Sequence, residues 1–364
     1  MLFFYFNYMD NIINSDSLVL GLMSGTSMDG LDISCARYYR NQKRWHFDLI
    51  ACETFSYDDE VRINLLKVFN KEIDLFDVEY RFTQIIIDYV QFFLNHHGLD
   101  IDLISSHGHT IFHDPNNGYT KQIGLGGLIS KHFNIPVVCD FRQQDIDFGG
   151  QGAPLVPIGD QLLFQQYDSC LNLGGIANIS FDLGGSRFAY DICPCNMILN
   201  NLSKKLGKDF DKNGEIAKVG NVNEILFQKL NKLDYYKLAY PKSLSKEYVD
   251  AHFNILIKEY SINVEDVVST FVEHVAYQIS NTFIKFNIKS SLLSGGGTFN
   301  KYLISRIQYF TKTNLIIPSA DIINFKEAII FGFLGVLRVL NENNCLSSST
   351  GANRDHSSGK IYFT

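Results

Sequence analysis

What this sequence lacks narrows the range of its partners. Positive charge is in deficit, with a formal net charge of -7, whereas nucleic acids and anionic membranes both favour a basic face. No apolar run is long and uninterrupted enough for a membrane helix, and the apolar start, Met1–Tyr8, has neither a basic region nor a cleavage site. We therefore expect a cytoplasmic protein that acts on a small molecule, with no nucleic-acid or membrane partner.

Two common phosphate-binding motifs are also missing, as is a disulfide framework. No G-x-x-x-x-G-K-[ST] occurs, and no G-x-G-x-x-G joins a strand to a helix. The seven cysteines are odd in number and mostly lie in apolar runs, which indicates buried thiols in a reducing compartment. Cys193-Pro194-Cys195 has no second cysteine or histidine cluster at ligand spacing, so we expect no metal-binding residues.

The stretch Gly21–Asp32 is the feature around which the first part of the chain is organised. Alternating apolar residues predict strands at Leu18–Leu20 and Leu31–Tyr38, with a third strand at Trp45–Phe55. Glycines in the connecting loop let the backbone approach a ligand, and hydroxyls stand beside exposed amides, which suits a phosphate. The alternative is an ordinary hairpin turn rich in small residues.

The same order of elements recurs from Ser169. A strand at Ser169–Leu173, a Gly-rich turn at Gly174–Asn178 and a strand at Ile179–Leu183 lead through a tight turn to a third strand at Arg187–Ile192. A chain of 364 residues favours two lobes. Two lobes built on one plan would grip the phosphates of a nucleotide from both sides.

A third Gly-rich segment, Gly295–Gly297, lies between a predicted strand and a predicted helix. Glycine there allows a flat base or ribose to lie on the backbone, and a plain turn between strand and helix is the alternative. Helical periodicity predicts helices elsewhere, at Asp59–Phe69, Phe76–Asn95, Val264–Phe286 and Lys326–Leu340.

Three polar positions are candidates for chemistry. Asp191 ends a strand and is the candidate general base, or else the N-cap of a helix over 196–206. Arg142, in a polar Gly-rich loop, suits an anionic group, with an ion pair between lobes as the alternative. The segment Ser106–Thr110 is expected at the end of a buried strand, where its histidines either contact ligand or are structural.

The run Ser24-Gly25-Thr26-Ser27-Met28-Asp29-Gly30 resembles the anhydro-N-acetylmuramic acid kinase family, within the actin, hexokinase and Hsp70-like ATPase superfamily. The resemblance extends from about Leu18 to Lys360. Further matches are Ser106-His107-Gly108, Asp140-Phe141-Arg142, Gly149–Pro157, Asn172–Asn178, Pro241-Lys242-Ser243, Glu327-Ala328 and Thr350-Gly351-Ala352.

This resemblance implies an α/β, two-lobed, actin-like (ribonuclease H-like) ATPase fold. Each lobe is expected to be a mixed sheet flanked by helices, with the active site in the cleft between the lobes. We expect residues 1–16 to be an extension, 17–159 to form the N-terminal lobe with the phosphate-binding hairpin, and 160–364 to form the C-terminal lobe with the catalytic aspartate and the adenosine-binding segment. The last helix and tail are able to pack back on the first lobe.

The implied reaction converts 1,6-anhydro-N-acetylmuramic acid, ATP and water into N-acetylmuramic acid 6-phosphate and ADP, during recycling of cell-wall peptidoglycan. In it, the aspartate matching Asp191 deprotonates a water that attacks C1 of the sugar. The bridging oxygen then takes the γ-phosphoryl group, while Mg²⁺ and the loop matching Gly25–Asp32 hold the phosphates. A homodimer is one open possibility for its assembly.

The resemblance also implies the contact residues. Nucleotide contacts are expected from Gly25, Thr26, Ser27, Met28, Asp29, Gly30, Leu31, Asp32, Gly174, Gly175, Asn178, Gly295, Gly296 and Gly297. Sugar contacts are expected from Ser24, His107, Gln122, Arg142, Asn196 and Glu327. No residue is assigned as a metal ligand.

Several positions depart from the family pattern. Where the family has Asp-Thr-Gly-Pro-Gly-Asn, this chain has Asp191-Ile192-Cys193-Pro194-Cys195-Asn196. Leu125 stands in place of an aspartate and His109 in place of a glutamine, and the usual Gly-Gly-Gly-Ala-His-Asn ends in Thr298-Phe299-Asn300. Two alternatives stay open: a divergent relative with another sugar or no activity, and an actin-like nucleotide-dependent regulatory protein.

Overall fold

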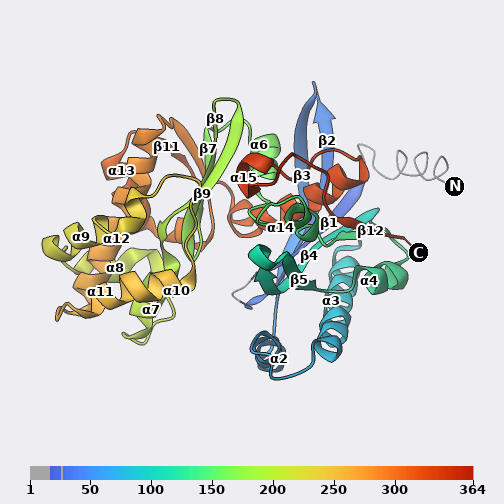
Figure 1. The fold of residues 1–364 in the computed structure, drawn as a ribbon, viewed down its shortest axis with the longest axis horizontal. Coiled ribbons are helices and arrows are strands. Elements are labelled where there is room, and N and C mark those ends of the chain that lie inside the picture. Colours follow the sequence, from blue (N-terminus) through green and yellow to red (C-terminus); the bar gives the residue numbers. More distant parts are fainter. Residues whose placement is uncertain (1–16, 26–27, 364) are drawn as a thin grey trace. The chain divides into compact units, whose positions relative to one another are not determined.

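The computed structural model describes residues 17–25 and 28–363, and these form two compact units (Figure 1). The first unit contains the described residues up to Leu163 and those from Phe325 onward, and the second is Phe164–Asn324. Each unit contains one mixed β-sheet together with helices. The predicted α/β class with two lobes is therefore confirmed.

The first sheet has the strand order β12-β6-β4-β1-β2-β3, with β5 paired to β4. Its strands β1 to β3 are antiparallel, β4 and β6 run parallel to β1, and β5 and β12 run antiparallel to their neighbours. The strand bounds are β1 Leu18–Ser24, β2 Gly30–Asn41, β3 Arg44–Ser56, β4 Leu103–Asp114, β5 Tyr119–Ile123, β6 Val137–Cys139 and β12 Lys360–Tyr362.

The second sheet has the order β11-β10-β7-β8-β9. Again the first three strands form an antiparallel meander, and parallel strands lie beside its first strand. The strand bounds are β7 Ser169–Leu173, β8 Ile176–Leu183, β9 Ser186–Pro194, β10 Ser290–Ser294 and β11 Asn314–Ile316. Followed from the edge strands β3 and β9, the two sheets have corresponding orders, β3-β2-β1-β4-β6 and β9-β8-β7-β10-β11. The repeat predicted from element order is therefore confirmed.

Helices complete each unit. Those of the first unit are α2 Asp59–Phe69, α3 Leu75–His97, η1 Pro115–Asn117, α4 Gly126–Phe133, α5 Gln143–Asp147, α6 Pro157–Leu163 and α15 Ser347–Thr350. Those of the second are α7 Asn196–Lys204, η2 Lys212–Gly214, α8 Glu215–Val219, α9 Glu224–Asn231, η3 Asp234–Lys237, α10 Lys246–Tyr248, η4 Val249–Asn254, α11 Ile255–Lys258, α12 Val264–Lys285, η5 Gly296–Phe299 and α13 Lys301–Phe310. Helix α14, Ala320–Val339, begins in the second unit and continues in the first.

Helix α14 lies directly against β1 because two glycines face each other. A Cβ added at Gly21 would lie 1.9 Å from the carbonyl oxygen of Ala328, and one added at Gly332 would lie 2.6 Å from the Tyr38 hydroxyl. The Tyr38 hydroxyl donates a hydrogen bond of 2.6 Å to the carbonyl of Ile329 on the same helix. The backbone of α14 is thereby fixed against the strand that leads into the first Gly-rich loop.

Replacing Gly21 with alanine should destabilise the first unit by at least about 1–3 kcal/mol, because the new methyl group overlaps the α14 backbone. Trp45 is the only tryptophan of the sequence and lies buried on β3, so its fluorescence during urea unfolding reports on this unit. Gly127→Ala on α4 is the control, because its Cβ would lie 3.3 Å or more from any neighbour. An equal urea midpoint for the two variants would contradict the prediction.

Some sequence expectations about the elements are wrong. The segment Ser106–Thr110 does not follow the end of a strand but lies inside β4, because β5 returns antiparallel and pairs with it, His109 opposite Ile123. Helix α14 begins at Ala320, earlier than the expected Lys326. The Ser-rich tail, 347–360, holds α15 and the start of β12.

The other predictions about composition can be checked in the same residues. All seven cysteines are free thiols and six are buried, as predicted. Within residues 17–25 and 28–363, no helix combines the length and the apolar character needed to cross a bilayer.

Candidate active site

Asp191 lies on β9 and is held by the segment Lys242–Leu244. One carboxylate oxygen, Oδ2, accepts a hydrogen bond of 2.8 Å from the backbone N–H of Leu244. The backbone N–H of Asp191 donates to the carbonyl of Lys242 at 3.0 Å, and the hydroxyl of Tyr235 donates to the carbonyl of Asp191. The N-cap alternative is wrong, because α7 is preceded by Cys195 as its N-cap and has no side-chain cap.

The carboxyl group of Asp191 is suited to accept a proton near neutral pH. Burial raises its pKa from the usual 3.8 to about 6, and the hydrogen bond from Leu244 opposes that rise. At pH 7 the group is therefore mostly ionised, yet it binds a proton more tightly than an ordinary aspartate. That combination favours general-base catalysis.

The second Gly-rich turn covers the start of α7. The carbonyl of Gly175 accepts hydrogen bonds from the backbone N–H groups of Cys195 and Met197, at 2.9 and 3.0 Å, and that of Gly174 accepts one from Asn196 at 3.2 Å. The Asn196 side chain donates to the carbonyl of Leu173 at 2.9 Å. These contacts tie the predicted sugar residue Asn196 to the predicted nucleotide-binding turn.

The third Gly-rich segment adjoins this turn, because β7 and β10 pair in parallel with Asn172 opposite Ser294. Gly297 is packed closely, since an added Cβ would lie 2.8 Å from the Leu173 side chain. Gly296 is exposed, and nothing lies within 4 Å of where its Cβ would be. Gly-rich backbone at the carboxyl ends of two neighbouring parallel strands is a typical ligand-binding position.

The first Gly-rich hairpin is described except for Thr26 and Ser27, which lie outside the described residues. The backbone N–H of Met28 donates to the carbonyl of Gly25 at 3.2 Å. Gly30 lies against β3, where an added Cβ would be 2.4 Å from the carbonyl oxygen of Phe55. Beyond it, the Leu31 side chain is in the core of the unit, so any ligand contact from that residue is through its backbone.

Two carboxylates meet near this hairpin. Asp32 accepts a hydrogen bond of 2.6 Å from the Thr54 hydroxyl, and Asp29 is exposed. Burial is the largest cause that raises the pKa of Asp32, and the charge of Asp29 adds to it. Burial likewise raises the pKa of Glu327, and the charge of Asp32 contributes. The charge of the predicted nucleotide residue Asp32 therefore acts on the predicted sugar residue Glu327, whose pKa the positive charges of Lys326 and Arg142 lower.

Arg142 is held by hydrogen bonds within the first unit. Its Nε donates to Nε2 of His107 at 3.0 Å, and its Nη1 donates to the carbonyl of Gly152 at 2.9 Å. Nδ1 of His107 donates to the carbonyl of Gly108 at 2.9 Å, so the ring is neutral and its tautomer is set. Burial lowers the pKa of Arg142 to about 10, which leaves it charged at neutral pH.

Two further predicted sugar residues are buried and already hydrogen-bonded. The Ser24 hydroxyl accepts from the Tyr57 hydroxyl at 2.9 Å and lies 3.0 Å from Nδ1 of His109. Gln122 donates to the hydroxyl of Thr120 at 2.8 Å. A direct sugar contact by either residue stays a prediction.

A hollow of about 500 Å³ in the second unit lies apart from the Asp191 carboxylate. Tyr190, Ile192, Tyr236 and Lys242 are among its lining residues, and Asp191 is not. Because side chains alternate along a strand, Tyr190 and Ile192 face away from the side of β9 on which Asp191 projects.

Comparison with known proteins now identifies the family. Residues 17–364 match the sequence profile described as "Anhydro-N-acetylmuramic acid kinase". The chain belongs to the anhydro-N-acetylmuramic acid kinase family. A kinase of this name from Caldanaerobacter subterraneus subsp. tengcongensis is 32% identical over 95% of this chain and 97% of its own length. The corresponding protein of Vibrio vulnificus strain YJ016 is 32% identical over 96% and 99% of the two chains.

Among solved structures, the chain is similar to the activator of the 2-hydroxyisocaproyl-CoA dehydratase from Clostridium difficile with bound ADPNP, at a TM-score of 0.43 and 13% identity over 89% of this chain and 96% of that one. That likeness is distant. The resemblance to the anhydro-N-acetylmuramic acid kinase family drawn from the sequence is confirmed by the family match.

The two cysteines that depart from the family pattern point into the core of the second unit. Cys193 and Cys195 are both fully buried there. Burial raises the pKa of Cys195 to about 12, so the thiol stays protonated. These replacements therefore alter the packing behind Asp191 and leave its own contacts in place.

Leu125, the other departure near the expected sugar residues, is the N-cap of α4 and makes no side-chain cap. The structure also assigns contacts that sequence reasoning missed. The family motif Pro241-Lys242-Ser243 has no role predicted from the sequence, yet its Lys242 carbonyl accepts the hydrogen bond from the Asp191 backbone, and Leu244 directly after it holds the carboxylate. The contact of His107 with Arg142 had no sequence signal beyond the presence of both residues in family motifs.

Proposed function

We propose that this protein converts 1,6-anhydro-N-acetylmuramic acid, ATP and water into N-acetylmuramic acid 6-phosphate and ADP. Membership of the anhydro-N-acetylmuramic acid kinase family supports this. The observation that carries it is Asp191, a carboxylate held by Leu244 and with a pKa raised to about 6. Seven free thiols are consistent with a reaction in the cytoplasm.

In this mechanism Asp191 takes a proton from a water molecule as its oxygen attacks C1 of the sugar. The bond between C1 and the bridging oxygen breaks, and that oxygen forms a bond to the γ-phosphorus of ATP as ADP leaves. The water oxygen stays on C1 as a hydroxyl, and its proton is on Asp191. General-base activation contributes about 10²–10⁴-fold to such a step.

ATP is proposed to lie against the Gly-rich backbone of both units. In the first unit the contacts come from Gly25–Asp32, and in the second from Gly174, Gly175 and Asn178 for phosphate and Gly295–Gly297 for the adenosine. The exposed backbone at Gly296 supports the last assignment.

Mg²⁺ fits the carboxylates of Asp29, Asp32 and Glu327. The charge of Asp29 raises the pKa of Asp32, and the charge of Asp32 raises the pKa of Glu327. A hard cation relieves such repulsion between like charges, and Mg²⁺ prefers carboxylate and phosphate oxygens. When bound, the ion supplies positive charge that offsets the phosphate oxygens. Asp32 is our candidate for holding it, with Glu327 beside it.

Arg142 is proposed to bind the carboxylate of the sugar's lactyl group. It is charged, half-buried and already oriented by His107 and Gly152, and a preorganised guanidinium binds a carboxylate with little loss of entropy. Asn196, Gln122 and Ser24 complete the proposed sugar contacts.

The test is ADP release by the purified protein with magnesium and ATP, with and without 1,6-anhydro-N-acetylmuramic acid, and with the product identified by mass. Sugar-dependent ADP release together with N-acetylmuramic acid 6-phosphate supports the proposal. ADP release without that product, or no sugar-dependent release, contradicts it and points to a changed substrate or a lost activity.

The pH dependence of this reaction should follow Asp191. The base acts only when ionised, so kcat/KM should fall about tenfold per pH unit as the pH drops below about 6. Initial rates between pH 5 and pH 8, at fixed free magnesium, measure this. The slow residual turnover of Asp191→Asn is the control and should lack this acidic limb. A wild-type profile that stays flat down to pH 5 would show that another group is the base.

A further inference from the structure

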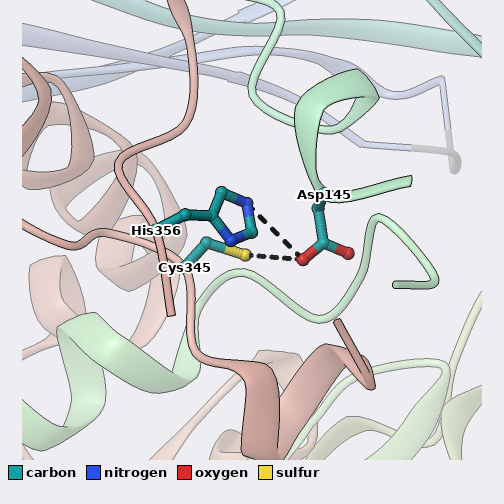
Figure 2. A group of neighbouring side chains, drawn as sticks. All are labelled: Asp145, Cys345 and His356. Carbon is teal, nitrogen blue, oxygen red and sulfur yellow. Dashed lines mark hydrogen bonds and ion pairs between the residues drawn. The ribbon is translucent and has the colours of Figure 1, made fainter. Parts of the chain in front are cut away.

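Three buried side chains of the first unit, none of them used by the mechanism above, converge on one point (Figure 2). They are Asp145 on α5 and two residues of the C-terminal segment, Cys345 and His356. The Cys345 Sγ lies 3.1 Å from the Asp145 Oδ1, and the His356 Nε2 lies 3.7 Å from the same oxygen. The side chains of Asp145 and His356 are 0% and 4% exposed.

The backbone brings Cys345 and His356 together. They face each other in an antiparallel bridge, in which each backbone N–H donates to the other residue's carbonyl at 3.1 Å. Directly opposed residues of an antiparallel pair project their side chains to the same face. The thiol and the imidazole therefore point together at Asp145, as Figure 2 shows.

The imidazole of His356 is held in one orientation by its Nδ1, and this leaves its Nε2 as a hydrogen-bond acceptor. Its Nδ1 lies 3.1 Å from the carbonyl of Arg354, so the proton is on Nδ1. Its ring packs nearly perpendicular to that of Phe148, at 4.9 Å between centroids. Nε2 is buried and has no hydrogen-bond partner among the described residues. A buried acceptor without a donor is costly, so a group that accepts its lone pair is expected there.

Asp145 is equally fixed. Oδ2 accepts a hydrogen bond of 2.7 Å from the backbone N–H of Gly152, and Oδ1 accepts one of 2.7 Å from the Thr350 hydroxyl. The lone pairs of Oδ1 and of the His356 Nε2 thus face one another in the buried interior of the unit. A cation between them resolves that conflict.

We propose that Asp145, Cys345 and His356 bind a zinc ion. Zinc bonds of about 2.0–2.1 Å to nitrogen or oxygen and about 2.3 Å to sulfur correspond to ligand separations of roughly 3.3–3.5 Å in a tetrahedron. The separations of 3.1 and 3.7 Å lie on either side of that range, and all three ligand atoms are within 4.8 Å of one another. A thiolate with an imidazole selects zinc over magnesium or calcium.

Zinc binding at this site leaves no net charge on the metal and its ligands, and it releases one proton. The thiol proton of Cys345 is released to solvent as the sulfur–zinc bond forms, so one thiolate and one carboxylate neutralise the two positive charges of the ion. A water molecule completes the tetrahedron. The carbonyl of Arg354 on Nδ1 of His356 is the kind of partner that orients an imidazole ligand of zinc.

The ion would join the C-terminal segment to the loop that positions Arg142. Gly152 donates to the Asp145 carboxylate through its N–H and accepts from Arg142 through its carbonyl. Because the cluster is buried, the role is structural, and it is distinct from the Mg²⁺ proposed at Asp32.

The first experiment measures metal content without reference to activity. The full-length protein is stripped with a chelator, dialysed against a zinc buffer with nanomolar free zinc, and analysed for metal per chain. One zinc per chain, and a higher thermal midpoint with zinc than with chelator, are expected. Loading the stripped protein with cobalt(II) should give a thiolate-to-metal charge-transfer band in the near ultraviolet. Less than about a tenth of a zinc per chain, or cobalt loading without that band, would overturn the proposal.

Variants assign the ligands. Cys345→Ser and His356→Gln should each lower the zinc content from one per chain to near zero. Cys35→Ser is the control, because Cys35 is an equally buried thiol of the same unit on β2, outside the cluster. Retention of zinc by Cys345→Ser, or its equal loss from Cys35→Ser, would contradict the assignment. If the two ligand variants fail to fold, the cobalt spectrum of the wild-type protein decides the question.

Discussion

Replacing Asp191 with asparagine should lower turnover of the anhydro-sugar by about 10²–10⁴-fold. The asparagine oxygen can still accept the hydrogen bond from Leu244, but it cannot take a proton from water. Because one base serves ring opening and phosphorylation together, both products of the reaction should fall together. ADP release and the mass of the sugar product, measured in the same reaction, check this, and retention of most turnover would show that Asp191 is not the base.

The stability of the same variant supplies its control. Burial raises the pKa of Asp191 in the folded protein to about 6. The free energy of unfolding of the wild type therefore falls as the pH rises from about 4 to about 6, and this loss stays constant at higher pH. Asparagine carries no such penalty. Asp191→Asn should therefore be more stable than the wild type at pH 7.5, by up to about 3 kcal/mol, with a difference that vanishes below about pH 4. A variant that is unfolded at pH 7.5, or less stable there than the wild type, would contradict this.

Replacing Lys326 with methionine should destabilise the first unit by about 3–5 kcal/mol. The Lys326 ammonium lies 2.8 Å from the Asp160 carboxylate on α6, and the side chains are 4% and 5% exposed. Removing the lysine takes a positive charge away from a carboxylate that is itself buried, which costs far more than the loss of an exposed pair. Urea unfolding followed by the fluorescence of Trp45 measures the change.

Two further variants test the physical reason. Lys360→Met removes the lysine of an exposed pair with Asp140, in which the lysine side chain is 69% exposed, and should cost less than about 1 kcal/mol. Adding Asp160→Asn to Lys326→Met removes the buried negative charge and should recover part of the stability. Equal urea midpoints for Lys326→Met and Lys360→Met would show that burial of the pair is not the reason for the loss of stability.

Local pattern was enough to predict much of the fold. The helix at Asp59–Phe69 has the bounds predicted from its periodicity, and the strand at Ser169–Leu173 those predicted from its apolar run. Such elements depend on spacing and turn residues within one stretch of chain. The shared plan of the two sheets could be predicted for the same reason, since each meander is continuous in sequence.

Contacts between distant segments could not be predicted in this way. The backbone of Leu244 reaches the Asp191 carboxylate across 53 positions, and the Cys345 thiol reaches Asp145 across 200. The error over His107 and His109 has a similar cause, because β4 extends only through its pairing with β5. Such contacts are decided by tertiary packing. The pattern of residues around one position does not show which distant residue will pack against it.

The interruption of the first unit has a consequence for synthesis on the ribosome. The second unit is one continuous stretch, Phe164–Asn324. The first unit is complete only after Phe325 and the residues that follow it have been synthesised. At about 5–20 residues per second, that wait lasts on the order of ten to thirty seconds. Throughout it, β1 lacks the helix that covers Gly21 and β6 lacks its partner β12. The half-made chain then exposes an apolar sheet face and an unpaired strand edge, so chaperones and codon-dependent translation speed should matter most for this stage.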